Sequence, residues 1–110
     1  MEIKISEIRG ATILQLIGSF DADTVEFFKK RSGELFESGI SKFIIDATGL
    51  AFIDSMGLGA MISLLRRVRE KKGDVKIFGL NSEVTEVFEI TRLNKLFDVC
   101  KDAGNAIEKF

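Results

Sequence analysis

Alternating apolar and polar side chains at the start of the chain predict an antiparallel pair of β-strands. Within residues 2–7, Ile3 and Ile5 fall on one face, as expected of a strand with one buried side. Residues 11–17 are more uniformly apolar, which is typical of a more central strand. Because Gly10 lies between the two segments and favours a turn, we expect a β-hairpin.

The period then changes to that of a helix, which we expect from about Asp23 to Ser38. Its apolar face is formed by Val25, Phe28, Leu35 and Phe36. Asp23 and Glu26 have the spacing of a capping box, in which the two side chains bond free backbone amides at the helix start. Gly39 is expected to end the helix, because glycine adopts the left-handed conformation without strain.

A short apolar run over residues 42–46 predicts a strand that is buried on both faces of a parallel sheet. A long amphipathic helix is expected over residues 56–72, with Gly73 as its stop. Its apolar stripe consists of Leu58, Met61, Ile62, Leu65 and Val68. The cations in its last turns suit the helix dipole and are Arg66, Arg67, Arg69, Lys71 and Lys72.

The last third of the chain continues the alternation of strand and helix. Residues 75–78 predict a strand, and Asn81 or Ser82 is expected to cap the helix after it. The inward residues of that helix are Val84, Val87 and Phe88. Residues 96–99 predict a short strand, and Asp102 is expected to cap a last helix. The apolar face of this helix holds Ala103, Ala106, Ile107 and Phe110.

The order of these elements, β-β-α-β-α-β-α-β-α, predicts an α/β fold. We expect a mixed, mostly parallel sheet of about five strands, with the N-terminal hairpin as its antiparallel edge and about four flanking helices. Because no linker, repeat or low-complexity tract interrupts the pattern, residues 1–110 are expected to form a single domain.

Composition narrows the function classes. The net charge of −1 gives no long-range field that would favour nucleic acid or an acidic membrane. No apolar run reaches the roughly 18 residues of a membrane helix. The absence of histidine removes Ser-His hydrolysis and histidine-ligated metal sites. The single cysteine, Cys100, cannot form an internal disulfide, and without an export signal the cytoplasm is the expected compartment.

The candidate chemistry centres on residues 52–61, where Asp54 and Ser55 precede the long helix. A hydroxyl here lies at or beside a helix N-terminus, close to unpaired backbone amides and the positive end of the helix dipole. Ser55 could therefore cap the helix, act as a nucleophile, help to cradle a phosphate group, or accept one.

Missing residues weaken two of these roles. A dinucleotide-binding loop that begins with Gly57 and Gly59 would need a third glycine or an alanine where Ile62 stands, and no Gly-Lys-Ser/Thr motif occurs. We therefore favour close packing of the helix start on the sheet as the reason for these glycines. A serine nucleophile needs a base, and the carboxylate of Asp54 is a weak one near neutral pH. We expect no enzymatic activity.

Two charged patterns have simple explanations. The cationic end of the long helix could hold phosphates, but the chain has no Tyr or Trp for base stacking, so we favour a solvated helix end. Asp21, Asp23, Asp46 and Asp54 lie in loops or at strand ends that share one edge of a parallel sheet, where a divalent cation is conceivable. We favour helix capping and loop solvation for these acids, and predict neither a metal nor a cofactor.

Two roles remain open for Ser55 on its chemistry alone. As a cap or first-turn residue, its hydroxyl would bond a backbone amide. As a phosphate acceptor, it would gain about −1.5 to −2 charges, and the amides and dipole of the helix start would favour the added anion.

Residues 52–59, Phe-Ile-Asp-Ser-Met-Gly-Leu-Gly, resemble the phosphorylation motif of STAS domains, the sulphate-transporter and anti-sigma-factor-antagonist family. Three further features agree: the pattern Gly18-x-Phe-Asp21-x-x-Thr24 ahead of the first helix, a strand that ends at Asp46 before Leu50, and the order of the elements. The resemblance covers nearly the whole chain and implies a STAS-type fold. Its best match is to the stand-alone bacterial anti-sigma factor antagonists.

This resemblance implies a partner-switching function. The unphosphorylated domain binds an anti-sigma factor that is also a serine kinase, and the sigma factor is thereby released. The ATP-bound kinase then phosphorylates Ser55, the complex dissociates, and a serine phosphatase resets the switch. By motif matching, the partner-binding surface comprises Asp21, Asp23, Thr24, Asp54, Ser55, Met56, Gly57, Leu58, Ala60 and Met61. Met56 stands where many relatives carry a second serine, which leaves Ser55 as the one acceptor in the motif.

Two alternatives stay open on the sequence. The chain could be a STAS docking subunit of a stress-signalling or membrane lipid-transport assembly, which would bind its partner without ATP-dependent release. It could instead bind a nucleotide at residues 54–60, although the missing lysine motif argues against this.

Overall fold

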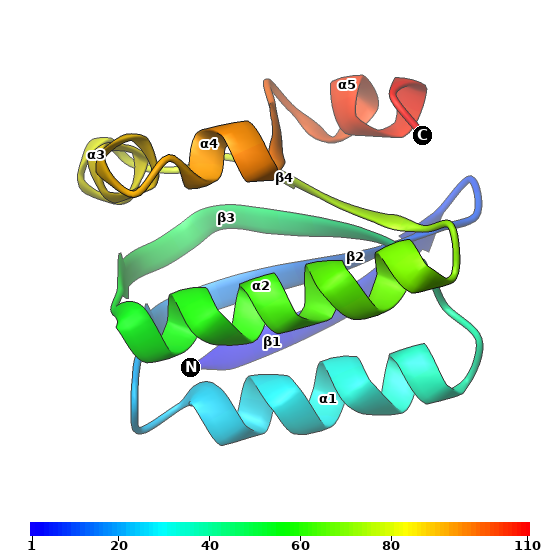
Figure 1. Cartoon of the computed structure of the whole chain (residues 1–110), viewed down its shortest axis with the longest axis horizontal. Coiled ribbons are helices and arrows are strands. Elements are labelled where there is room, and N and C mark those ends of the chain that lie inside the picture. The colour runs from blue at the N-terminus through cyan, green and yellow to red at the C-terminus, as the bar shows by residue number, and fades with distance from the viewer.

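The computed structural model describes all residues, 1–110, as one five-stranded sheet with helices packed against it (Figure 1). The strands lie in chain order and are β1 Glu2–Ile8, β2 Ala11–Phe20, β3 Lys42–Ile53, β4 Asp74–Phe78 and β5 Asp98–Cys100. The helices are α1 Val25–Glu37, α2 Ser55–Glu70, α3 Ser82–Ile90, α4 Leu93–Leu96 and α5 Ala103–Glu108. The α/β class predicted from the sequence is confirmed.

The N-terminal hairpin forms the antiparallel edge of the sheet, as predicted. β1 pairs with β2 from Glu2↔Ile17 to Ile8↔Ala11, and the other three strand pairs are parallel. The connecting turn uses two residues with positive φ, Arg9 at 49° and Gly10 at 83°. Two consecutive positive φ values suit a tight hairpin, because they match the right-handed twist of the strands.

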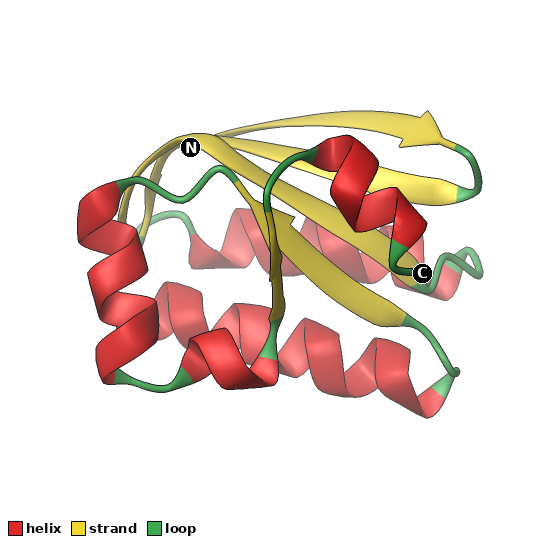
Figure 2. Cartoon of the chain, turned by 90° about the horizontal axis from the view of Figure 1, so that it is seen from above, coloured by secondary structure: helices red, strands yellow, loops and turns green.

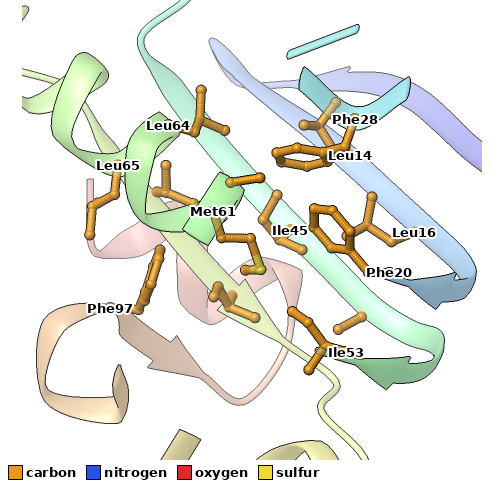
Figure 3. Packing of buried hydrophobic residues seen from close by; sticks show 14 of the residues in the cluster. Leu14, Leu16, Phe20, Phe28, Ile45, Ile53, Met61, Leu64, Leu65 and Phe97 are labelled. Carbon is orange, nitrogen blue, oxygen red and sulfur yellow. The ribbon is translucent and has the colours of Figure 1, made fainter. Parts of the chain in front are cut away.

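Helices cover the two faces of the sheet unequally (Figure 2). The main core packs α1, α2, α3 and the α4 region against one face, and Figure 3 shows Phe20, Phe28 and Met61 within it. Successive strand residues point to opposite faces, so Ile44 lies on the other face from its neighbours Phe43 and Ile45. There it forms a smaller cluster with Ala106 of α5. The second face is therefore covered by α5 alone.

β3 extends further than the predicted residues 42–46. Its first part pairs with β4 only from Lys42 to Asp46, whereas on the other side it follows β2 until Phe20↔Ile53. Small residues in this second half, such as Gly49, give little apolar signal. A Cβ atom at Gly49 would lie 3.2 Å from the carbonyl oxygen of Leu16, so the strand approaches β2 closely there. The end of β3 consequently projects beyond β4.

Two predicted helix ends are wrong in detail. α1 begins after Thr24, and no capping box forms, because the amide of Asp23 donates to the Asp21 carboxylate instead. At the end of α2 the left-handed residue is Lys72, with φ 62°, and not Gly73. Gly73 is required for another reason, since a Cβ atom there would overlap the carbonyl oxygen of Ser41. Gly39, with φ 103°, ends α1 as predicted.

The C-terminal third contains one helix that the periodicity did not predict. Residues Leu93–Leu96 form the single turn of α4, and the last strand is Asp98–Cys100 instead of residues 96–99. A helix of four residues is too short to show a helical period, and its apolar residues imitate a strand. Within the described chain, no helix has both the length and the apolar character needed to cross a membrane.

Candidate functional site

The predicted site lies where β2 and β3 end and their following helices begin. Residues 21–24, which connect β2 to α1, lie beside residues 54–58, which open α2, and we call these two segments the rim. The amide of Asp54 donates to the carbonyl oxygen of Phe20 at 3.1 Å, which continues the β2–β3 ladder into the rim. Figure 1 shows both segments and α3 at the same end of the sheet.

Asp54 holds the rim together through both of its carboxylate oxygens. It is the N-cap of α2, where Oδ1 accepts from the amides of Met56 at 2.9 Å and Gly57 at 3.0 Å. Its Oδ2 accepts from the amide of Ala22 at 3.2 Å. One side chain therefore caps the helix and ties it to the loop that is 32 residues away in sequence.

Ser55 is the first residue of α2 and is exposed. Its hydroxyl takes no part in the bonds that cap α2, because Asp54 makes them. Asp54 already occupies the amides of Met56 and Gly57, so these two amides are not free to bond an anion on Ser55. The Ser55 side chain is thus free for a partner, and a phosphate group on it would stand in solvent.

The β2–α1 loop is fixed by its own side chains. Thr24 Oγ1 donates to the carbonyl oxygen of Ser19 at 2.9 Å and accepts from the amide of Asp21 at 3.0 Å. Asp21 Oδ1 accepts from the amide of Asp23 at 3.0 Å. These short-range bonds keep the loop compact, so the rim is held in one conformation beside Ser55.

The predicted partner-binding residues differ widely in exposure. Those that are exposed are Asp23, Ser55 and Met56, and Met56 leaves 49% of its surface open. Those that are half-buried are Asp21, Thr24, Asp54 and Leu58. Those that are buried are Gly57, Ala60 and Met61. The structure therefore brings all ten to one edge but presents only part of them to a partner.

Gly57 is needed for the close approach of α2 to the sheet. A Cβ atom there would lie 2.6 Å from the carbonyl oxygen of Phe20 and 2.9 Å from Cγ1 of Ile53. Gly59 has no such neighbour, since nothing lies within 4 Å of its built Cβ. The interpretation of this glycine pair as helix-to-sheet packing is confirmed for Gly57 and does not extend to Gly59.

Three of the four carboxylates that suggested a metal site have the capping or turn roles that we favoured, whereas the carboxylate of Asp23 makes no such bond. Asp54 caps α2, Asp21 closes its own loop, and Asp46 Oδ1 accepts from the amide and hydroxyl of Thr48. No three side chains of the metal-ligating types come together in the structure. Of residues 54–60, where the alternative hypothesis placed a nucleotide, only Ala60 lines a surface hollow, and that hollow lies between α1 and α2.

Sequence reasoning missed two residues beside the rim. Phe52 leaves 50% of its surface exposed at the end of β3. Asn81 caps α3, as predicted, by accepting from the amide of Val84 at 2.8 Å, but its Nδ2 also donates to the carbonyl oxygen of Leu50 at 3.1 Å. This second bond joins residues 31 positions apart, so no local pattern announces it.

The fold and site define a STAS domain. The family model described as STAS domain matches residues 2–106, and the chain belongs to this family. Among curated relatives, the anti-sigma F factor antagonist of Paenibacillus polymyxa is 23% identical over 97% of this chain and 92% of its own length. The anti-sigma-B factor antagonist of Listeria monocytogenes is 31% identical, over 50% of this chain and 48% of its own. The resemblance to anti-sigma factor antagonists noted in the sequence is confirmed.

Solved structures show the same fold at low identity. Protein TM1081 of Thermotoga maritima superposes with a TM-score of 0.93 at 19% identity, covering 97% of this chain and 92% of that one. The anti-sigma factor antagonist SpoIIAA in its unphosphorylated form gives a TM-score of 0.75 at 19% identity over 98% of this chain and 96% of its own. SpoIIAA in the phosphorylated form gives the same TM-score of 0.75.

Proposed function

We propose that this protein is an anti-sigma factor antagonist whose binding to an anti-sigma factor is switched off by phosphorylation of Ser55. The observation that carries the proposal is the free, exposed hydroxyl of Ser55 on a rim whose shape Asp54 holds fixed. The partner is an anti-sigma factor that is also a serine kinase and brings its own ATP. A serine phosphatase restores the binding form, and the cycle takes place in the cytoplasm.

The two forms of SpoIIAA support a switch that leaves the fold intact. This chain matches the unphosphorylated and the phosphorylated structure equally well, with a TM-score of 0.75 for each. Because Ser55 is exposed, a phosphate group on it would displace no neighbouring side chain and would not disturb the core. The modification would therefore change the surface and leave the packing of α2 as it is.

The size of the expected effect follows from charge and desolvation. Phosphorylation adds about −1.5 to −2 charges and a bulky group where a partner must approach closely. A charge of this kind that is buried without a counterion costs several kcal/mol. About 4 kcal/mol corresponds to a roughly thousandfold loss of affinity, since each 1.4 kcal/mol is tenfold. One hydroxyl is therefore sufficient to release the partner.

The assignment is tested with the anti-sigma factor kinase encoded in the same genome. We expect this kinase and ATP to label the wild-type protein and Ser63→Ala, but not Ser55→Ala, as read by mass spectrometry of the tryptic peptides. Ser63 is the matched control, because it is an exposed serine on the same helix. Equal labelling of Ser55→Ala and wild type would show that the acceptor lies elsewhere.

A binding measurement separates the switch from simple docking. We expect Ser55→Asp to bind the kinase more weakly than wild type in calorimetry, with a smaller loss than the phosphorylated protein shows, because a carboxylate is smaller and carries less charge than a phosphate. Ser63→Asp should bind as wild type does. A wild-type complex that ATP never dissociates would instead indicate a docking subunit, and tight nucleotide binding by the isolated chain would indicate a nucleotide-binding protein.

A further inference from the structure

An apolar groove opens beside the rim, between the end of β3 and helix α3. Its volume is about 90 Å³, enough for one aliphatic side chain, and it is open to solvent. The lining residues are Ala51, Phe52, Ile53, Glu83, Val84 and Val87. Five of the six are apolar, and Glu83 is the charged one. Because Ile53 is two residues before Ser55, anything seated in the groove lies next to the phosphorylation site.

The groove exists because β3 projects beyond β4. β4 pairs with β3 only as far as Asp46, so the second half of β3 has no strand on that side. Asn81 occupies this edge instead: its Nδ2 bonds the carbonyl oxygen of Leu50 while its Oδ1 caps α3. The side chain thereby fixes α3 against the end of β3 and shapes the walls of the groove.

The groove is bordered by large apolar side chains that are exposed to solvent, and Phe52 is one of them. Half of its area is exposed, whereas the adjacent Ile53 is only 4% exposed. Met56, at the start of α2, leaves a further large apolar side chain open at 49%. Large apolar side chains that are exposed around a groove are typical of protein interaction sites.

Charge distinguishes this edge from the rest of the molecule. The three segments that form the rim and the groove, residues 19–26, 46–58 and 79–89, contain no lysine or arginine. Their acidic residues are Asp21, Asp23, Glu26, Asp46, Asp54, Glu83, Glu86 and Glu89. Among these, only Glu26 has an ion pair within the chain, with Lys29 at 3.7 Å. The groove and the rim thus share one acidic surface, on which Glu26 alone is paired with a cation of the same chain.

We propose that the groove receives an apolar side chain from a basic segment of the anti-sigma factor. The apolar walls select the aliphatic side chain, and Glu83 at the groove selects a lysine or arginine next to it. This inference rests on the proposed function, because it assigns the groove to the same partner that the rim binds. It makes two residues specificity-determining: Phe52, the first residue of the phosphorylation motif, and Glu83, which lies outside the motif.

The acidic surface also limits how phosphorylation acts. A basic partner segment would attract a phosphate on Ser55, so the sign of the added charge does not by itself drive release. The phosphate lies at the edge of a groove that must close on a side chain of the partner. Binding is then made unfavourable by the volume of the phosphate and by the free energy needed to remove its water.

Affinities for the purified anti-sigma factor kinase, measured by calorimetry without ATP, test the groove. We expect Phe52→Ser and Glu83→Lys each to weaken binding by about tenfold or more, which is 1.4 kcal/mol or more. The matched controls are Ile8→Ser, which removes an exposed apolar side chain from the far end of the β1–β2 hairpin, and Glu34→Lys, which reverses an exposed charge on α1. Both controls should stay within about twofold of wild type, and raised salt should weaken wild type more than Glu83→Lys.

The outcomes separate the groove from the switch. If wild type binds and both groove variants bind equally well, with melting temperatures showing that all are folded, the groove proposal is overturned while Ser55 keeps its role. If wild type does not bind the kinase at all, the proposed function fails and the groove proposal fails with it. Self-association through the groove, detected as a dimer of wild type that Phe52→Ser abolishes, would likewise overturn the assignment to a basic partner.

Discussion

The two ends of helix α2 use charge in opposite ways. At its C-terminal end, two of the five cations bond groups of the same chain: Arg67 donates to Glu37 at 3.1 Å, and Arg69 donates to Asp74 at 3.3 Å and to the carbonyl oxygen of Leu96 at 3.0 Å. At its N-terminal end, Asp54 caps the helix and Asp21 closes its own loop. The other acids at this end are exposed and make no ion pair, and they are Asp23 of the rim and Glu83, Glu86 and Glu89 of α3.

A network of ions continues the C-terminal end of α2 into the sheet. Lys76 is only 4% exposed and donates to Asp74 and Asp98, each at 3.1 Å, while Lys109 of the α5 region donates to Asp98 at 2.9 Å. These charges stabilise the fold by pairing with one another. The comparison teaches that the ion pairs at one end of α2 support the fold, whereas the unpaired acids at the other end remain available to a partner.

The largest effect on stability is expected at the N-terminal end of α2, from Gly57→Ala. Its Cβ atom would meet a backbone carbonyl oxygen that cannot move aside, so we expect the free energy of unfolding to fall by about 3 kcal/mol. Gly59→Ala is the matched control. Since its Cβ would meet nothing, it should stabilise the helix by about 1 kcal/mol. Urea denaturation of both variants measures the difference, and equal effects would contradict the packing described here.

At the other end, Lys76→Ala is expected to destabilise the protein by about 2 kcal/mol. The substitution removes a buried cation and leaves Asp74 and Asp98 without their shared partner. Water can reach these two carboxylates in part, which keeps the cost below that of a fully buried pair. Lys72→Ala, at an exposed position, serves as the control and should stay near wild type in the same urea titration. If Lys76→Ala were as stable as wild type, the ion-pair network would contribute nothing to stability.

Asp54→Ala separates stability from binding at the rim. Loss of the cap and of the bond to Ala22 should cost about 1 kcal/mol of stability, as for other N-caps. Asp102→Ala, which removes the cap of α5, should cost a similar amount. Only Asp54→Ala should also weaken binding to the anti-sigma factor kinase, because only it loosens the loop beside Ser55. Equal binding by both variants would refute this positioning role.

The smallest expected effect is the pH dependence of the paired end. Hydrogen bonds from Lys109 and Lys76 hold the pKa of Asp98 below its ordinary value of 3.8, against the opposing effect of burial. A carboxylate with a lowered pKa stabilises the fold fully above its ordinary pKa and loses that contribution as the pH falls through its folded-state pKa. Asp98→Asn should therefore flatten the stability profile below about pH 4 in acid titrations monitored by circular dichroism. If stability depended on pH in the same way in Asp98→Asn and wild type, the ion-pair network would not lower the pKa of Asp98.

Periodicity predicted the helices and strands that are long enough to show it, including the hairpin and both long helices. It failed where the signal is short or non-local. α4 has only four residues, and the second half of β3 is defined by its approach to β2 instead of by apolar side chains. Gly73 was correctly singled out but for the wrong reason, because only the fold places Ser41 against it.

The site shows the same division between local and distant signals. The position of Ser55 at a helix start follows from the sequence, and the motif resemblance supplied its proposed role. The bond from Ala22 to Asp54 and the bond from Asn81 to Leu50 span 32 and 31 residues, so no local pattern reveals them. The groove could not be predicted from the sequence for that reason. The absence of lysine and arginine from residues 77–91 does, however, indicate an acidic surface, and this signal was overlooked.

The central claim is that the Ser55 hydroxyl switches binding of the partner. The most direct test follows a preformed complex with the anti-sigma factor kinase in real time, by interferometry, after ATP is added. Wild type should dissociate upon phosphorylation, whereas the Ser55→Ala complex should form normally and stay bound. Dissociation of the Ser55→Ala complex at the wild-type rate would contradict the account.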